Sequence, residues 1–291
     1  MAVQSSITTQ TAIAGRLDDS RTATPSAAPS RAAVAALRAA AAFWFVVTVL
    51  GQLAMAAYVV GFYGRAAMKG EFETWNKVLP KGYMARDTLG NLNLSLHLVF
   101  VVVIVISGAL QLTPAVRRLW PRFHHWNGRL YLASALLMSL GGLYMVWTRN
   151  TGGDVLQHLS TSINALLIIG FGVMAVREAM ARRLDRHRRW ALRFFLAVSG
   201  VWFFRVGLMF WILVNQGPVG FDPQTFRGPA LTGIAFGQYL FPLALLELYF
   251  RAQRAGSRQH FAMAGGLVAM TAVTAVGVFG ASMIMWLPRL Q

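Results

Sequence analysis

Long apolar segments separated by short polar turns occupy most of the chain after about residue 39. Each segment reaches the roughly 20 residues that a helix needs to cross the hydrocarbon core of a bilayer. The turns between them contain Gly, Pro, Asn and Asp, which favour chain reversal. The pattern predicts seven transmembrane helices, over residues 39–63, 91–112, 126–147, 156–177, 190–214, 230–250 and 261–286. The longest connection, residues 64–90, has room for one short helix.

These segments predict an all-α fold, a polytopic membrane helix bundle with a four-helix core built from spans two to five. Residues 1–36 are rich in Ala, Ser, Thr and Arg and contain no apolar stretch, which predicts a disordered tail. Residues 37–291 then form one integral membrane domain. Within it, the helix pairs 91–147 and 156–214 resemble each other, since "RRLWPRFHHW" in the first is echoed by "RRLDRHRRW" in the second.

Composition supports a membrane location and explains the high charge. The chain is 56% hydrophobic and 13% charged, with a mean hydropathy of +0.51 and a net charge of +17. Of its 27 Lys and Arg residues, 18 lie at 16–38, 117–129, 177–193 and 251–258, all on one side of the predicted map. The positive-inside rule then puts the N-terminus in the cytoplasm and the C-terminus outside. The expected partner is therefore the lipid bilayer, with anionic lipid near the arginines, and not nucleic acid.

Histidine is the residue type that suggests chemistry. The chain has no cysteine, which excludes iron–sulfur clusters, thiolate-ligated haem and covalently attached haem. His97 and His158 are expected near the outer surface, whereas His124 and His187 are expected near the inner one. A helix starting at Pro121 and another capped by Asp185 would place the inner two in first helical turns. The two levels are about 15 helical residues, or roughly 20 Å, apart.

Two such levels in a four-helix core predict one or two b-type haems with paired histidine ligands, two being the more consistent with the pattern. Gly128 lies one turn after His124 and would leave clearance for a flat macrocycle. This favours His124 over His125, whose equivalent neighbour is the bulky Arg129. The alternative is that histidines in basic turns contact lipid headgroups and water, and that His97 bonds a neighbouring helix.

Two further charged residues need partners. Arg205 lies inside the fifth span, where an unpaired guanidinium costs at least about 2.5 kcal/mol. Either a haem propionate would accept from it, or Gln238 or a backbone carbonyl would. Glu247 precedes Arg251 by four residues, so these two are expected to pair on one helix face.

Several of these residues carry a family resemblance. His97, Gly108 and Gln111, the "HxWxGRxY" element that begins at His124, and "HRRWALR" at 187–193 look like a family of predicted bacterial membrane proteins of unknown function, over about residues 90–255. The resemblance implies a bacterial inner-membrane location and supplies no activity. In that family His124 holds the histidine position, while a basic residue usually stands where His125 is. The order of the histidines is also similar to that of the ascorbate-reducible dihaem cytochromes b, which have six helices and transfer electrons across membranes.

The first functional hypothesis is therefore a haem-binding membrane protein that moves electrons across the bilayer, an oxidoreductase if it is an enzyme. No nucleotide-binding motif is present, so a quinone, a small reductant or a separate protein would supply the electrons. The alternative is a non-redox membrane protein, a transporter or scaffold with structural histidines. The spans look mostly uninterrupted, with Pro242 as the one clear internal break, which argues against a transporter. A weaker third option is an integral enzyme acting on a lipid or quinone.

Overall fold

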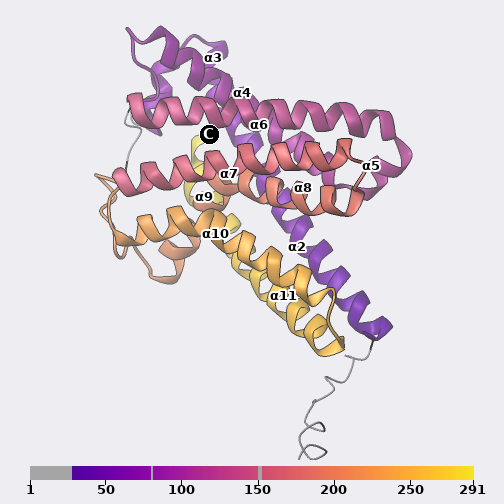
Figure 1. Cartoon of the computed structure of the whole chain (residues 1–291). Helices are drawn as coiled ribbons and strands as arrows, with labels where there is room; N and C mark the ends of the chain where they lie inside the picture. The colour runs from indigo at the N-terminus through magenta and orange to yellow at the C-terminus, as the bar shows by residue number, and fades with distance from the viewer. Residues whose placement is uncertain (1–27, 80, 150–152) are drawn as a thin grey trace, which may run out of the picture.

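The computed structural model describes residues 28–79, 81–149 and 153–291 (Figure 1). Apart from one β-bridge between Asp222 and Arg227, the regular structure in these ranges is helical. The α-helices are α2 (Arg31–Tyr58), α3 (Arg65–Met68), α4 (Thr88–Leu112), α5 (Pro114–Leu119), α6 (Pro121–Arg149), α7 (Val155–Met180), α8 (Leu184–Val198), α9 (Gly200–Val214), α10 (Pro229–Ala252) and α11 (Ser257–Gly280). Two π-helical segments, η1 (Val59–Gly64) and η3 (Ala281–Trp286), and two 3₁₀ segments, η2 (Phe72–Lys77) and η4 (Leu287–Arg289), complete the list.

Local sequence explains where several helices begin. The Asp87 and Asp154 carboxylates accept from the backbone N–H groups of Gly90 and Gln157 and so cap α4 and α7. Pro114, Pro121 and Pro229 occupy the first positions of α5, α6 and α10, where the missing N–H has no helical partner to lose. The turns between the apolar segments are thus encoded locally.

The predicted multi-pass bundle is confirmed. Six helical segments in the described residues are long and apolar enough to cross a membrane, and the bent pair α8–α9 makes a seventh. This pair corrects the expectation of an uninterrupted fifth span, because α8 and α9 meet at Ser199 with a 54° bend. Ser-Gly pairs are a common cause of such kinks, and Ser199 is followed by Gly200.

The helices form two groups (Figure 1). α4 packs against α6, α6 against α7 and α7 against α8, as expected for spans two to five. After the bend, α9 leaves this group and packs against α10 and α11, while α2 runs alongside α11. The break at Ser199 therefore lets the fifth span contribute to both halves of the bundle.

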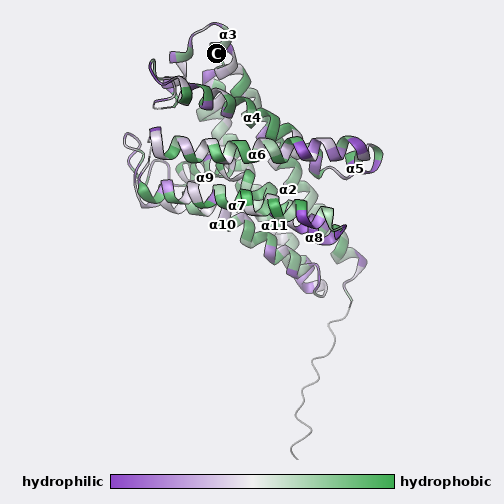
Figure 2. Ribbon diagram, turned by 45° about the horizontal axis from the view of Figure 1, so that its top comes forward, coloured by the Kyte–Doolittle hydropathy of each residue, from purple (hydrophilic) through white to green (hydrophobic). Residues whose placement is uncertain are grey.

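The two ends of the bundle differ in charge. The arginine-rich end comprises the start of α2, α5, the α7–α8 turn and the α10–α11 turn; the opposite end comprises α3, η2 and the α9–α10 loop. Figure 2 shows apolar residues between polar ends, with a hydrophilic stretch at α5 and the start of α8. At the arginine-rich end the Ser30 N–H donates to Ser257 Oγ, and at the opposite end Arg65 donates to the Leu290 carbonyl. The start of α2 and the last described residues thus lie on opposite sides, as an odd number of spans requires.

The boundary of the predicted tail is only partly described. Residues 1–27 lie outside the described residues, whereas α2 begins at Arg31, inside the segment 1–36 assigned to the tail. Its Ser30 cap accepts from the Ala33 N–H, so the helix starts before the apolar stretch does. Loop 64–90, where one short helix was expected, contains α3 and η2.

Candidate functional site

His124 and His187 both lie at the arginine-rich end. Each is in the first turn of its helix, His124 in α6 and His187 in α8. Their backbone N–H groups donate to the Trp120 and Arg183 carbonyls at 3.0 and 2.9 Å. The α8 helix begins two residues earlier than expected, so Arg183 is the cap and Asp185 lies in the first turn. The two imidazoles are close enough for an electrostatic interaction.

Hydrogen bonds fix which nitrogen of each ring carries the proton. His187 Nδ1 lies 2.9 Å from the Ala175 carbonyl of α7, and a carbonyl can only accept, so Nδ1 donates. His124 Nε2 lies 3.3 Å from the amide nitrogen of Gln111, which can only donate, so Nε2 accepts. Both rings therefore carry their proton on Nδ1 and keep a lone pair on Nε2, the form in which imidazole binds a metal.

Gly128 provides space, and Gln111 of α4 fills it. A Cβ at Gly128 would lie 2.9 Å from the Gln111 amide nitrogen. Gln111 Oε1 accepts from Asn127 Nδ2 at 3.0 Å, and the same Asn127 nitrogen donates to the Ser107 carbonyl at 2.8 Å. The clearance predicted for a macrocycle thus holds a polar link between α4 and α6. A haem bound to His124 would have to displace Gln111.

The adjacent histidines His124 and His125 differ in burial. His124 is half-buried, and its Nδ1 is enclosed without a hydrogen-bond partner among the described residues. His125 is exposed, with its ring centroid 6.0 Å from that of His124. Because this Nδ1 carries the proton, what it lacks is an acceptor, and it is not itself the metal-binding atom. His124 is the better ligand candidate because its ring is less exposed than that of His125 and keeps a lone pair on Nε2.

His97 and His158 lie in α4 and α7. His158 is buried in α7 with its ring edge-on to Trp147 of α6, at a centroid distance of 5.9 Å. His97 is half-buried in α4, its Nδ1 lacks a hydrogen-bond partner among the described residues, and Arg205 of α9 is within electrostatic reach. The pairing of His97 with His158 around a haem stays a prediction.

Arg205 has a partner in its own helix. Its Nη1 donates to the Val201 carbonyl at 3.1 Å, so the backbone alternative expected for it is present. Gln238 is not the acceptor, because its Oε1 has no hydrogen-bond partner among the described residues. The guanidinium also lies within electrostatic reach of Tyr58 and Tyr63. Its remaining N–H donors are the ones that a haem propionate would use, and that role also stays a prediction.

Glu247 does not form the expected ion pair with Arg251. Its carboxylate pairs with Arg193 of α8, at 2.6 Å from Nη2 and 2.7 Å from Nε, rather than with Arg251 one turn along α10. In this contact two N–H groups of one planar guanidinium donate to the carboxylate, which is stronger than a single exposed contact within one helix. This ion pair joins α8 to α10.

Sequence reasoning missed the polar residues at the break in the fifth span. Asn164 of α7 donates to the Ala197 carbonyl at 3.2 Å, and Gln52 of α2 donates to Ser199 Oγ at 2.9 Å, both in buried surroundings. A bend leaves backbone groups without their helical partners, and in a membrane other helices must satisfy them. The Ser-Gly pair at 199–200 was the available signal.

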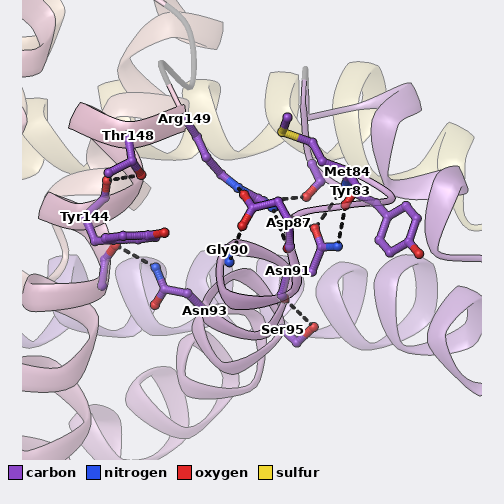
Figure 3. Close-up of polar contacts among 12 residues, drawn as sticks. Tyr83, Met84, Asp87, Gly90, Asn91, Asn93, Ser95, Tyr144, Thr148 and Arg149 are labelled. Atoms are coloured by element: carbon purple, nitrogen blue, oxygen red, sulfur yellow. Dashed lines mark hydrogen bonds and ion pairs between the residues drawn. The ribbon is translucent and has the colours of Figure 1, made fainter.

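A second missed cluster lies at the opposite end of the bundle (Figure 3). Arg149, at the end of α6, is 5% exposed and donates to Asp87, to the Gly82 carbonyl and to Asn91 at 2.7 to 2.9 Å. The Gly90 N–H and the Arg149 guanidinium hold the pKa of the Asp87 carboxyl below its ordinary value. This cluster fastens the loop before α4 onto α6.

Comparison with known proteins identifies the central part of the chain. Residues 94–233 match the family described as "Predicted membrane protein (DUF2306)". This segment is similar to that family. It runs from α4 to the start of α10 and includes all four predicted ligands, His97, His124, His158 and His187. The predicted resemblance to a membrane protein family of unknown function is confirmed.

The comparisons add no activity to the DUF2306 segment. No curated protein matches the chain and no solved structure does. The similarity to the ascorbate-reducible dihaem cytochromes b therefore stays a prediction. Within the described residues, no group of three or more His, Asp or Glu side chains is arranged to hold a metal ion. A haem iron with two axial histidines needs only a pair, so the His124–His187 pair is the relevant arrangement.

Proposed function

We propose that the chain binds a b-type haem at its arginine-rich end, with His124 and His187 as axial ligands. The observation that carries the proposal is the matched state of the two rings, which are both protonated on Nδ1 and lie within electrostatic reach of each other. When bound, the haem would supply a one-electron redox centre. The Ala175 carbonyl would orient His187 by accepting from Nδ1, as partners of ligating histidines commonly do. Arg117, within electrostatic reach of His124, would pair with a propionate.

A second haem is proposed separately, between His97 and His158, with Arg205 as its propionate partner. The orphaned Nδ1 of His97 and the unused donors of Arg205 support it. Two haems at opposite ends of the bundle would let electrons cross the bilayer. A quinone or a small reductant would supply them. By the positive-inside rule, the arginine-rich end would face the cytoplasm of a bacterial inner membrane.

Absorption spectroscopy tests both haems. Protein purified from haem-replete cells should show a Soret band and a reduced-minus-oxidised α-band, and the pyridine haemochrome should report one or two haems per chain. His124→Ala and His187→Ala should each remove the same haem.

The controls are two histidine variants that should leave the haem content unchanged. One is His125→Ala, next to a proposed ligand, and the other is His260→Ala, because the Nδ1 of His260 bonds the Gly256 carbonyl at the start of its own helix. His97→Ala should affect only a second haem. A wild-type protein without a Soret band would exclude the proposal.

The bend between α8 and α9 favours the second candidate, a non-redox transporter. Discontinuous helices with polar residues inside the bundle are typical of transporter binding sites. Gln52, Asn164 and Ser199 supply such residues at the bend. The sequence analysis argued against a transporter because the spans looked uninterrupted, and the bend removes that argument.

Thiol labelling separates the two candidates, because the chain has no cysteine of its own. Ser199→Cys should react with a small water-soluble thiol reagent if a water-filled path reaches the bend. Val173→Cys, on the exposed surface of α7, provides a lipid-facing control that should stay unreactive. Equal, slow labelling at both positions would remove the support for transport.

A further inference from the structure

A cavity of about 420 Å³ opens between α8 and α10 at the arginine-rich end. Its walls are Arg189, Arg193, Glu247, Phe250, Arg251 and Arg254. Figure 2 shows a hydrophilic stretch at the start of α8. The cavity is distinct from the His124–His187 pair, because His187 turns toward Ala175 of α7 rather than toward α10.

The cavity is strongly positive. Four guanidinium groups face one carboxylate, an excess of three positive charges. Glu247 is engaged by Arg193, at 2.6 Å. In the described part of the chain, Arg189, Arg251 and Arg254 have no carboxylate within ion-pair distance. Three unneutralised guanidinium groups around one hollow create a site for an anion.

Aromatic rings help to hold the arginines in place. The Arg193 guanidinium lies over Trp190 and Phe250 at 4.6 and 5.5 Å from the ring centroids, and that of Arg189 lies over Phe250 at 5.4 Å. Stacking uses the face of the guanidinium and leaves its in-plane N–H groups able to donate. The Arg193–Glu247 pair further fixes one wall of the cavity. The site is thus partly organised before any ligand binds.

The position of the cavity suggests the source of the anion. Trp120 and Trp126, at the same end of the bundle, are 62% and 68% exposed. Exposed tryptophan beside arginine is typical of the membrane–water interface, and Arg129 lies over the Trp126 ring at 4.8 Å. A cavity at this level faces lipid headgroups. Basic pockets between membrane helices bind phosphate-bearing headgroups in this way.

We propose that the cavity bounded by Arg189, Arg193, Arg251 and Arg254 binds the phosphate group of an anionic phospholipid. Planar guanidinium groups match phosphate oxygens in two-pronged hydrogen bonds. Phe250 supplies an apolar surface beside the charged groups. A zwitterionic lipid also carries phosphate, but its own cation would be repelled by the excess positive charge. The site therefore selects anionic over zwitterionic lipid.

The test uses the full chain in detergent, titrated with phosphatidylglycerol, with phosphatidylcholine or with inorganic phosphate. Binding is measured by thermal shift and by lipid adducts in native mass spectrometry. The wild type should bind phosphatidylglycerol preferentially. The triple variant Arg189→Gln, Arg251→Gln, Arg254→Gln should bind it roughly tenfold to a hundredfold more weakly. Arg193 is kept because its ion pair joins two helices.

A matched triple variant, Arg118→Gln, Arg122→Gln, Arg182→Gln, removes the same charge from exposed positions at the same end and should lose less than about threefold. Equal losses in both triple variants would overturn the proposal in favour of diffuse surface charge. Inorganic phosphate that protects as well as phosphatidylglycerol would overturn the lipid assignment. If the glutamine variant unfolds without lipid, the corresponding lysine variant, which keeps the charge, replaces it in the test. The lysine variant should recover most of the phosphatidylglycerol binding. A folded lysine variant that does not bind phosphatidylglycerol also contradicts the site.

Discussion

The Arg149 guanidinium donates to the Asp87 carboxylate over 2.7 Å, although the two residues lie 62 positions apart in the sequence (Figure 3). Arg149 is the last residue of α6 and Asp87 caps the first turn of α4. One carboxylate therefore serves both as a helix cap and as an ion-pair partner. Because the arginine side chain is only 3% exposed, its charge depends on this acceptor and on neighbouring oxygens.

Removal of the Asp87 charge should destabilise the protein more than removal of Arg149. Asp87→Asn leaves a buried guanidinium without its anion, whereas Arg149→Gln leaves a carboxylate that water can reach. The expected result is a fall in Tm of several degrees for Asp87→Asn and a smaller fall for Arg149→Gln, measured by tryptophan fluorescence in detergent. Glu73→Gln, an exposed acid in the same loop, is the control and should leave Tm unchanged. Identical falls for Asp87→Asn and Glu73→Gln would show that the ion pair contributes nothing.

The same carboxylate should give the opposite end of the bundle an acid-sensitive contact. The pKa of Asp87 is held below its ordinary value of 3.8 by the Gly90 N–H and by Arg149. A lowered folded-state pKa means that the contribution is present above pH 3.8 and disappears as pH falls through the lowered value. The difference in Tm between wild type and Asp87→Asn should therefore be constant near neutral pH and shrink as the pH falls below 3.8. A difference that persists unchanged in acid would contradict this assignment.

Hydropathy and charge predict the number of spans and their ends because these properties are local. The partner of Glu247 was not predictable in the same way. Arg251 is near in sequence, but Arg193 is near in space only because α8 packs beside α10. Likewise Gly128 is recognisable as a small residue after His124, whereas the Gln111 side chain that fills the space comes from another helix. Contacts between helices depend on how the helices pack in three dimensions, which a short stretch of sequence does not reveal.

The break in the fifth span shows the same limit at the level of the backbone. A window of apolar residues averages over Ser199 and Gly200, so α8 and α9 look like one helix in sequence. The bend is accommodated by Asn164 and Gln52, which come from α7 and α2. The sequence therefore contained a weak local signal, while the residues that stabilise the bend are distant from it.

Asn164→Ala should weaken the fold by leaving the Ala197 carbonyl without a partner. Hydrogen bonds between membrane helices contribute about 0.6 kcal/mol on average and up to about 1.7 kcal/mol, so a loss near the upper value is expected for a freed backbone carbonyl. Thermal unfolding in detergent measures it. Ser134→Ala is the matched control, because Ser134 is equally buried and its hydroxyl has no partner among the described residues. Equal Tm values for the two variants would mean that Ala197 finds another donor.

Gly128→Ala tests whether Gln111 is the neighbour that makes glycine necessary. The new methyl group would lie 2.9 Å from the Gln111 amide, so Gln111 must move and lose its contacts with Asn127 and His124. The expected cost is roughly 0.5–1.5 kcal/mol for each hydrogen bond lost, since Gln111 is flexible enough to avoid a larger strain. Gly170→Ala is the control, because a Cβ there meets nothing within 4 Å. The double variant Gly128→Ala, Gln111→Ala should be no less stable than Gln111→Ala alone. If the losses of stability from the two substitutions instead add in full, a group other than Gln111 fills the space beside Gly128. The glycine would then not be needed for the polar link from α4 to His124.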